Sequence, residues 1–338
     1  MRTTSLVTEY SRLFPGVRKV FVIPLINKEN KQTDYLYQLY KPLIENKNPG
    51  EPEIESLSVF AHPKLFLSKL KGEKVLLHYH WFEVKDVKSF LGIFWKLLWL
   101  ILYKLFGGKM IWTVHNKYPH EGYRTFNKSI RIIIARLTNS LHVHCSSAIE
   151  ITAPILKVKR EKYFVVPHPG FEVKIFNKEE SRNTLNNKYL ANSLKDDDKL
   201  FLMFGAIARY KGIKEVIEIF NELPPGKKLL IAGFIKKGNE VYFRELNNLI
   251  EDKEKIILIG KLIPDEDVPV FFNSTDYVIF NYEDVLTSGG VHLALNYQKP
   301  VIIPSVGCLK ELEGKGVFHF EIGSDRKKNL FKLTELLN

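Results

Sequence analysis

Short apolar runs alternate with segments of helical spacing along most of this 338-residue chain. Strands are predicted at 19–24, 75–79, 110–114, 141–145 and 163–166, and again at 200–204, 228–232, 256–259, 277–280, 301–303 and 317–320. Consecutive parallel strands need a crossover connection, which is usually a helix. The alternation therefore predicts an α/β protein with two successive Rossmann-like, doubly wound parallel sheets. Ligands of such sheets bind beyond the carboxyl ends of the strands.

One polar stretch separates the two series of strands. Residues 172–199 are rich in Asn, Lys, Asp, Glu and Ser and carry few large apolar side chains. This composition is typical of a linker between domains. We therefore predict an N-terminal domain at 1–170, a linker at 171–198, a second domain at 199–322 and a C-terminal helix at 323–338.

The charge of the chain favours anionic partners. Its net charge of +12 suits phosphorylated small molecules, nucleic acid or an acidic membrane surface. A nucleic-acid-binding protein is the less favoured alternative, because no RNP, KH or zinc-finger pattern is present and the cations are scattered among acidic residues. Cys145 and Cys308 form no CxxC pattern, so neither a disulfide framework nor a zinc site is indicated, and a reducing, cytoplasmic setting is expected.

The most apolar segment of the chain is 89–106. It is shorter than the ~20 apolar residues of a membrane span, and Lys96 and Lys104 interrupt it. Aromatic side chains recur at positions 95, 99 and 103, on one side of a predicted helix. Two interpretations remain open: a helix lying on an anionic membrane surface, and a helix buried against the rest of its domain.

Two strand–turn–helix connections in the second half have the composition of an anion site. After strand 200–204 the chain carries Gly205, Arg209, Lys211 and Gly212. After strand 277–280 it carries Glu283, Asp284, Thr287, Ser288, Gly289 and Gly290. Free N–H groups at a helix N-terminus bind phosphate, and Lys or Arg adds charge-assisted hydrogen bonds. We predict a diphosphate between Arg209, Lys211 and the turn at 287–290, in a site that is neither a GxGxxG nor a Walker A motif.

Several segments together resemble GT-B glycosyltransferases of the family-4-like group, in particular bacterial members that build surface polysaccharides. In the second half these are FGAIARYKG, IAG, LIGKLIPDEDVPVFFNSTDYVIFNY and the SGG helix followed by KPV. In the first half they are KVFVIP, HYHW and IWTVHNKYPHE. The resemblance implies a GT-B fold and transfer of a sugar from a nucleotide-diphosphate donor. It also implies no metal and no cofactor, because basic residues and helix N-termini stabilise the leaving diphosphate.

The chain departs from the family pattern at one place. Retaining members carry Glu-x7-Glu before the KPV-like strand, and the matching positions here are Val285 and Leu293. The departure weakens the transfer of the retaining donor contacts to this chain. It leaves open an inverting enzyme, which needs a general base on the acceptor side.

The loop after strand 110–114 contains the candidates for that chemistry. His120 and Glu121 are the predicted proton acceptors, and the resemblance implies that His115 lies near the donor sugar. Three ionisable groups in so short a loop indicate a functional site. On the acceptor side we predict His80 and Trp81, with Trp81 stacking on a sugar or lipid, and His168. His142 and His144 alternate along a strand and are predicted to be structural.

The expected partners are a nucleotide sugar, a lipid-linked saccharide acceptor and, through residues 89–106, an anionic membrane surface; nucleic acid is not expected. The protein is predicted to be cytoplasmic and peripheral to the inner face of the cell membrane. A GT-B-type nucleotide-sugar epimerase remains the alternative enzyme, since it shares this architecture but needs no exposed aromatic helix.

Overall fold

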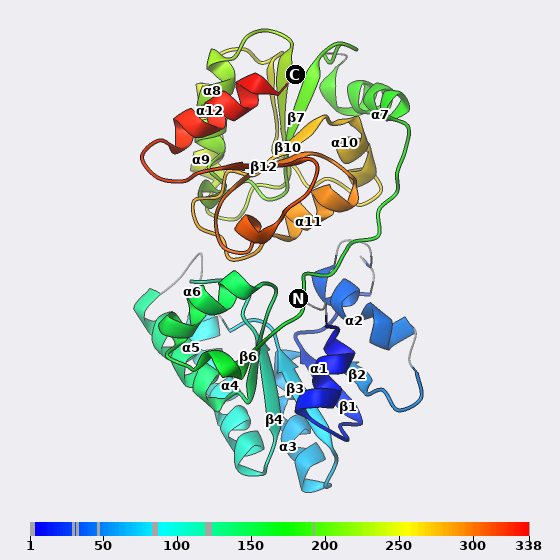
Figure 1. Cartoon of the computed structure of the whole chain (residues 1–338), viewed down its shortest axis with the longest axis vertical. Coiled ribbons are helices and arrows are strands. Elements are labelled where there is room, and N and C mark those ends of the chain that lie inside the picture. The colour runs from blue at the N-terminus through cyan, green and yellow to red at the C-terminus, as the bar shows by residue number, and fades with distance from the viewer. Residues whose placement is uncertain are drawn as a thin grey trace. The chain divides into compact units, whose positions relative to one another are not determined.

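The computed structural model describes residues 4–28, 31, 34–45, 48–82, 87–118, 124–191 and 193–337. The chain divides into two compact units, Met1–Pro169 and Gly170–Asn338 (Figure 1). Each unit contains a six-stranded sheet, and every strand pairing is parallel. The prediction of two doubly wound parallel sheets is thereby confirmed.

The first unit has the strand order β2-β1-β3-β4-β5-β6. Its strands are β1 (Lys19–Ile23), β2 (Glu53–Ser56), β3 (Val75–Tyr79), β4 (Lys109–Thr113), β5 (Ser140–Val143) and β6 (Tyr163–Val165). Its helices are α1 (Leu6–Leu13), α2 (Tyr35–Glu45), α3 (His62–Leu70), α4 (Val87–Leu105), α5 (Arg124–Leu137) and α6 (Ser146–Leu156). All five residues of β3 are buried, which explains its continuous apolar sequence. Helices α1 and α2 share a hydrophobic core with β1.

The second unit has the strand order β12-β11-β10-β7-β8-β9. Its strands are β7 (Lys199–Phe204), β8 (Lys227–Ala232), β9 (Ile256–Ile259), β10 (Tyr277–Ile279), β11 (Val301–Pro304) and β12 (Val317–Phe320). Its helices are α7 (Lys178–Leu185), α8 (Ile213–Glu222), α9 (Glu240–Leu249), α10 (Val268–Ser274), α11 (Gly289–Asn296) and α12 (Arg326–Leu336). The order of strands reverses between β7 and β10, so ligands are expected beyond the carboxyl ends of these two strands.

The two faces of the second sheet are covered by different helices (Figure 1). Leu200 and Leu202 point into a core that includes α7, α10 and α11. Phe201 and Met203, the alternate residues of β7, point into a core with α8, α9 and α12. This alternation follows from the pleat of the strand, which sends successive side chains to opposite faces.

Three elements of the first unit were not predicted from the sequence. Strand β2 lies at 53–56, outside the predicted strands, and it is a half-exposed edge strand with the polar sequence EIES. Helix α1 has a Ser5 N-cap whose hydroxyl accepts from the Thr8 N–H. Helix α3 packs against α4. Polar edge strands lack the apolar run by which buried strands are recognised.

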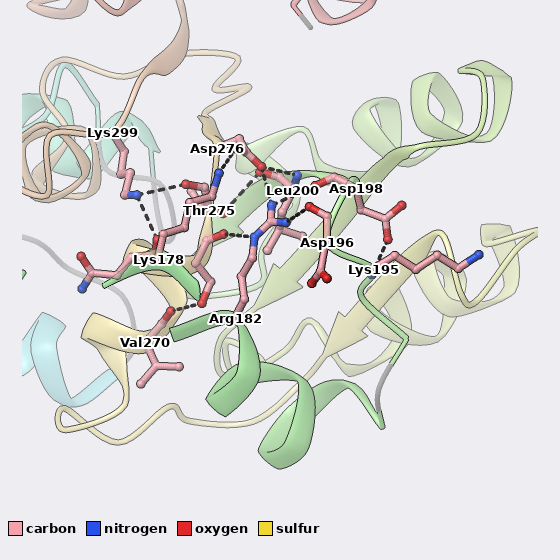
Figure 2. A network of polar contacts seen from close by, with 12 residues as sticks. Lys178, Arg182, Lys195, Asp196, Asp198, Leu200, Val270, Thr275, Asp276 and Lys299 are labelled. Atoms are coloured by element: carbon pink, nitrogen blue, oxygen red, sulfur yellow. Dashed lines mark hydrogen bonds and ion pairs between the residues drawn. The ribbon is translucent and has the colours of Figure 1, made fainter. Parts of the chain in front are cut away.

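The segment predicted as a linker contains α7, which packs against α10 within the second unit. The guanidinium of Arg182 donates to the carbonyl oxygens of Ser274, Asp196 and Asp198 and to the carboxylate of Asp276 (Figure 2). Asp276 also accepts from the Leu200 N–H at the start of β7, at 2.8 Å. These contacts fix α7 to the amino ends of the two central strands, β7 and β10.

Candidate active site

A small pocket lies beyond the carboxyl ends of β7 and β10, where the order of strands reverses. Its lining includes Gly205, Lys211, Asn281 and Tyr282. Lys211 belongs to a short 3-10 turn, Arg209–Lys211, which directly precedes α8. The fold thus brings the turn after β7, one of the two predicted phosphate sites, next to the residues that follow β10.

Lys211 is the cation at this pocket. Its Nζ donates to the carbonyl oxygen of Phe204 at 3.1 Å. Burial, followed by the charge of Lys236, lowers the Lys211 pKa to about 8. A side-chain carbon at Gly205 would lie 3.1 Å from Nζ, so the glycine leaves room for the ammonium group. A desolvated ammonium of this kind gains strongly from an anionic ligand.

Gly212 is required by close packing against the end of β10. It has φ +62°, and a side-chain carbon there would collide with the carbonyl oxygen of Asn281. The Asn281 amide donates to the Gly212 carbonyl at 2.9 Å, and Arg326 Nε donates to the Asn281 Oδ1 at 3.0 Å. Sequence reasoning missed Asn281 and Arg326, since nothing in the sequence links positions 45 residues apart.

The turn before α11 carries the second set of predicted phosphate ligands. Ser288 is the N-cap of α11, accepts from the Val291 N–H and lies 2.8 Å from the Tyr282 hydroxyl. The hydroxyl of Thr287 is shielded from solvent and has no hydrogen-bond partner among the described residues. A buried hydroxyl without a partner costs free energy unless a ligand supplies one. Tyr282 lines the Lys211 pocket and contacts Ser288, so it joins the two sets.

Arg209 has different surroundings from Lys211. Its guanidinium pairs with Glu245 of α9 at 2.9 Å and lies 4.6 Å from the centroid of the Tyr242 ring. It lines a separate charged hollow together with Gly212, Glu283 and Arg326. Glu283 and Asp284 are both exposed. The structure therefore groups Lys211 with Gly205, and Arg209 with Glu283.

In the first unit, aromatic and histidine side chains gather where β3, β4 and β5 end. His115 Nε2 lies 3.1 Å from His80 Nδ1, and the Trp81 ring stacks on the His115 imidazole with centroids 4.6 Å apart. Tyr35 packs edge-on against His115, and its ring centroid is 5.2 Å from that of His168. Burial lowers the pKa of His80 and His115 well below the ordinary value and that of His168 to about 4. The histidines are therefore neutral at pH 7.

His120 and Glu121, the predicted proton acceptors, lie outside the described residues. His78, Thr113 and His142 extend the cluster into the buried interior through hydrogen bonds of 2.7 and 2.9 Å. Sequence reasoning placed His142 among structural residues and did not include Thr113. Within the described ranges, no group of three or more His, Cys, Asp or Glu side chains is arranged to hold a metal ion.

Comparisons with solved structures define the class of fold. The crystal structure of Anabaena Alr3699/HepE in complex with UDP and glucose matches at 14% identity and a TM-score of 0.66, covering 95% of this chain and 89% of that one. A glycosyltransferase from Rickettsia africae ESF-5 matches at 15% identity and a TM-score of 0.59, covering 95% and 93%. Sucrose-phosphate synthase from Thermosynechococcus elongatus matches at 16% identity and a TM-score of 0.58, covering 81% and 68%. This is the GT-B fold.

A family model matches the second unit of the chain. Residues 187–337, which contain the Lys211 pocket and α11, match the family model of Glycosyl transferases group 1. This match lies in the second unit, and it agrees with the resemblance of the motifs there to GT-B glycosyltransferases. No curated protein sequence matches the chain.

Proposed function

We propose that the protein transfers a sugar from a nucleotide-diphosphate donor to a lipid-linked glycan acceptor in bacterial surface polysaccharide synthesis. The observation that carries the donor half is the buried ammonium of Lys211, beside Gly205 and at the N-terminal side of α8. The donor's diphosphate binds between this ammonium and the turn Thr287–Gly290, whose Thr287 hydroxyl has no protein partner among the described residues. Preorganised donors of this kind stabilise a departing diphosphate without a metal.

A thermal-shift panel of UDP, GDP, ADP and CMP tests the donor site. A ligand that binds only the folded protein stabilises it by about 2.7 kcal/mol at a hundred times its dissociation constant. The nucleotide of the true donor should therefore raise the melting temperature well above the others. UDP is the first choice, because the Anabaena structure contains it. Equal melting temperatures with all four nucleotides at millimolar concentration would argue against a nucleotide-diphosphate donor.

The first unit supplies the acceptor side in this proposal. His115 contacts the donor sugar, while Trp81 stacks on the acceptor and His80 and His168 complete the lining. His120 and Glu121 remain the proposed proton acceptors of an inverting displacement. Incubation with the preferred nucleotide sugar, with and without a lipid-linked saccharide, distinguishes transfer from epimerisation, and the anomeric configuration of the product decides between inversion and retention.

The acceptor's lipid is expected at α4. Exposed apolar side chains recur along one side of this helix and continue past its end: Leu91, Phe94, Trp95, Leu98, Ile101, Leu105 and Phe106. The neighbouring helix α3 adds Leu67 and Leu70, which are also exposed. The other side of α4 is buried at Ile93, Leu100 and Tyr103, so this side packs against the rest of its domain. No helix in the described part of the chain is long and apolar enough to cross a membrane.

Lys88 is exposed in the first turn of α4, and Lys71 is exposed at the end of α3, which packs against α4. An apolar helix face with flanking cations is the pattern of helices that lie in the surface of an anionic membrane. We infer peripheral binding to such a surface, which would hold the enzyme beside a lipid-linked acceptor.

Vesicle flotation of matched variants tests this binding. Leu105→Ser removes a side chain that is 75% exposed on the α4 surface, and Leu262→Ser removes one that is 71% exposed in the second unit. Burying a leucine contributes roughly 1.5–3 kcal/mol, so Leu105→Ser should lower partitioning into phosphatidylglycerol vesicles about tenfold or more. Leu262→Ser should leave partitioning unchanged. Equal flotation of both variants and the wild type would show that α4 does not contact the membrane.

A further inference from the structure

A continuous chain of hydrogen bonds runs through the buried interior of the first unit and ends at His115. The successive contacts are Val166 O to His142 Nε2 (3.1 Å), His142 Nδ1 to Thr113 Oγ1 (2.9 Å), Thr113 Oγ1 to His78 Nε2 (2.7 Å), His78 Nδ1 to Tyr40 Oη (2.7 Å), Tyr40 Oη to His80 Nε2 (2.9 Å) and His80 Nδ1 to His115 Nε2 (3.1 Å). His142, His78 and His80 each use both ring nitrogens, whereas Thr113 and Tyr40 each make two contacts through one hydroxyl oxygen.

The direction of this chain is set at its inner end. A carbonyl oxygen can only accept, so His142 must donate from Nε2 to Val166. Burial lowers the pKa of His142 well below its ordinary value, and the ring is neutral. A neutral imidazole with Nε2–H has an unprotonated Nδ1, which must accept from the hydroxyl of Thr113.

The same argument continues to His78. Thr113 has a single hydroxyl proton, which it gives to His142, so its oxygen accepts from Nε2–H of His78. Burial keeps His78 neutral as well, and its Nδ1 is therefore an acceptor. Tyr10 Oη and Tyr40 Oη lie 2.6 and 2.7 Å from this nitrogen, and Tyr10 also donates to Tyr40 Oη at 3.4 Å. Burial raises the pKa of both phenols, so both keep their protons.

The last two links then follow. Tyr40 gives its proton to His78, so its oxygen accepts from Nε2–H of His80. The unprotonated Nδ1 of His80 accepts from Nε2–H of His115. The opposite order would have Tyr40 donate to His80 instead. It would leave Tyr40 Oη and His78 Nδ1, 2.7 Å apart, as two acceptors with no proton between them.

We propose that the Val166 carbonyl, through His142, Thr113, His78, Tyr40 and His80, holds His115 in the Nε2–H tautomer, so that His115 Nδ1 accepts a hydrogen bond from a hydroxyl group of the bound ligand. His115 Nδ1 has no hydrogen-bond partner among the described residues. It is also not among their polar atoms that are both unpaired and shielded from solvent. The chain members are positioning residues that act through His115. Only the assignment of the ligand as a sugar rests on the function proposed above.

Ligand-free protein labelled with 15N-histidine provides the first test. Long-range proton–nitrogen NMR spectra distinguish the two neutral tautomers, and single His→Gln variants assign the signals. His78, His80, His115 and His142 should all show Nε2–H. His144 should show the opposite tautomer, since its Nδ1 faces the Val166 carbonyl at 3.0 Å and its Nε2 faces the Tyr35 hydroxyl at 2.8 Å. His115 with Nδ1–H, or as a mixture, would overturn the proposal.

Variants of Thr113 provide the second test. Thr113→Val removes the hydroxyl that transmits the direction, and His115 should then show both tautomers; Thr113→Ser keeps the hydroxyl and should retain Nε2–H alone. Thr138→Val is the matched control, because Thr138 is a buried threonine that donates to the Ile134 carbonyl, away from the chain. A single Nε2–H tautomer of His115 in Thr113→Val would show that the chain of hydrogen bonds does not determine this tautomer.

Kinetics connect the tautomer to the ligand. A protein that is only partly in its binding-competent form loses apparent affinity in proportion to that fraction. Thr113→Val should therefore lower kcat/KM for the preferred nucleotide sugar at least about twofold. Thr113→Ser and Thr138→Val should not lower it. If no nucleotide sugar is turned over by the wild type, the proposed function fails, whereas the tautomers of the free protein are measured all the same.

Discussion

Replacing Arg182 by methionine should lower the free energy of unfolding of the second unit by about 3–5 kcal/mol, the usual cost of removing one partner from a buried ion pair. The Arg182 and Asp276 side chains are only 10% and 11% exposed, and their atoms approach to 2.7 Å. Methionine fills similar volume but leaves the carbonyl oxygens of Ser274, Asp196 and Asp198 without this donor. The loss would be measured by denaturant unfolding of the full chain, with hydrogen exchange identifying the second unit.

The control for this variant is Arg160→Met. Arg160 also pairs with a carboxylate, that of Glu150, but the two side chains are 67% and 52% exposed. Exposed pairs contribute about 0–1 kcal/mol, so this variant should unfold almost like the wild type. Similar losses in the two arginine variants would mean that burial of the Arg182 network (Figure 2) does not decide its contribution.

Lys211→Met should weaken nucleotide-diphosphate binding by roughly 1.5–3 kcal/mol, the range for a hydrogen bond to a charged group. The ammonium is the cation of the pocket at β7 and β10, and methionine removes its charge while keeping most of its length. Lys214→Met is the matched control, because Lys214 lies one turn further on and is 63% exposed. Calorimetric titration of both variants with the preferred nucleotide measures the difference. Unchanged affinity in Lys211→Met would remove this lysine from the donor site.

The pH dependence of binding follows from the same group. Burial lowers the Lys211 pKa to about 8, so the free protein loses this positive charge as the pH rises through that value. Nucleotide affinity of the wild type should therefore fall between pH 7 and pH 9. In Lys211→Met the affinity should change little across the same range. A parallel decline in both proteins would assign the titration to another group.

The fold was largely predictable because its sheets are parallel and buried. Strands such as Val75–Tyr79 are apolar throughout, and the helices between them follow from spacing alone. Strand β2 was missed because its Glu53 and Glu55 belong to a half-exposed edge. The polar sequence of α7 gave no sign of packing, because its attachment depends on Arg182 meeting a carboxylate 94 residues away.

The candidate site was predictable only for residues that belong to a recognisable local sequence pattern. Gly205, Lys211 and Ser288 follow directly from strand–turn–helix patterns, and the structure connects them through Tyr282. Arg209 has the same sequence context as Lys211, yet it pairs with Glu245, a partner that no local pattern reveals. The chain of hydrogen bonds that ends at His115 depends on Tyr40 and Thr113, whose hydroxyls contact histidines about 35–40 residues away in the sequence.

The central position of β7 also determines when the Lys211 pocket can exist. One wall follows β7, and the other follows β10, which joins β7 through contacts 76 residues apart. Closing so long a loop costs entropy before any contact compensates for it. Any opening that separates β10 from β7 dismantles the pocket, whereas loss of the distant β9 edge need not. A ligand in the pocket therefore stabilises the pairing of β7 with β10 by mass action. Ligand binding and the local stability of this sheet are thus coupled.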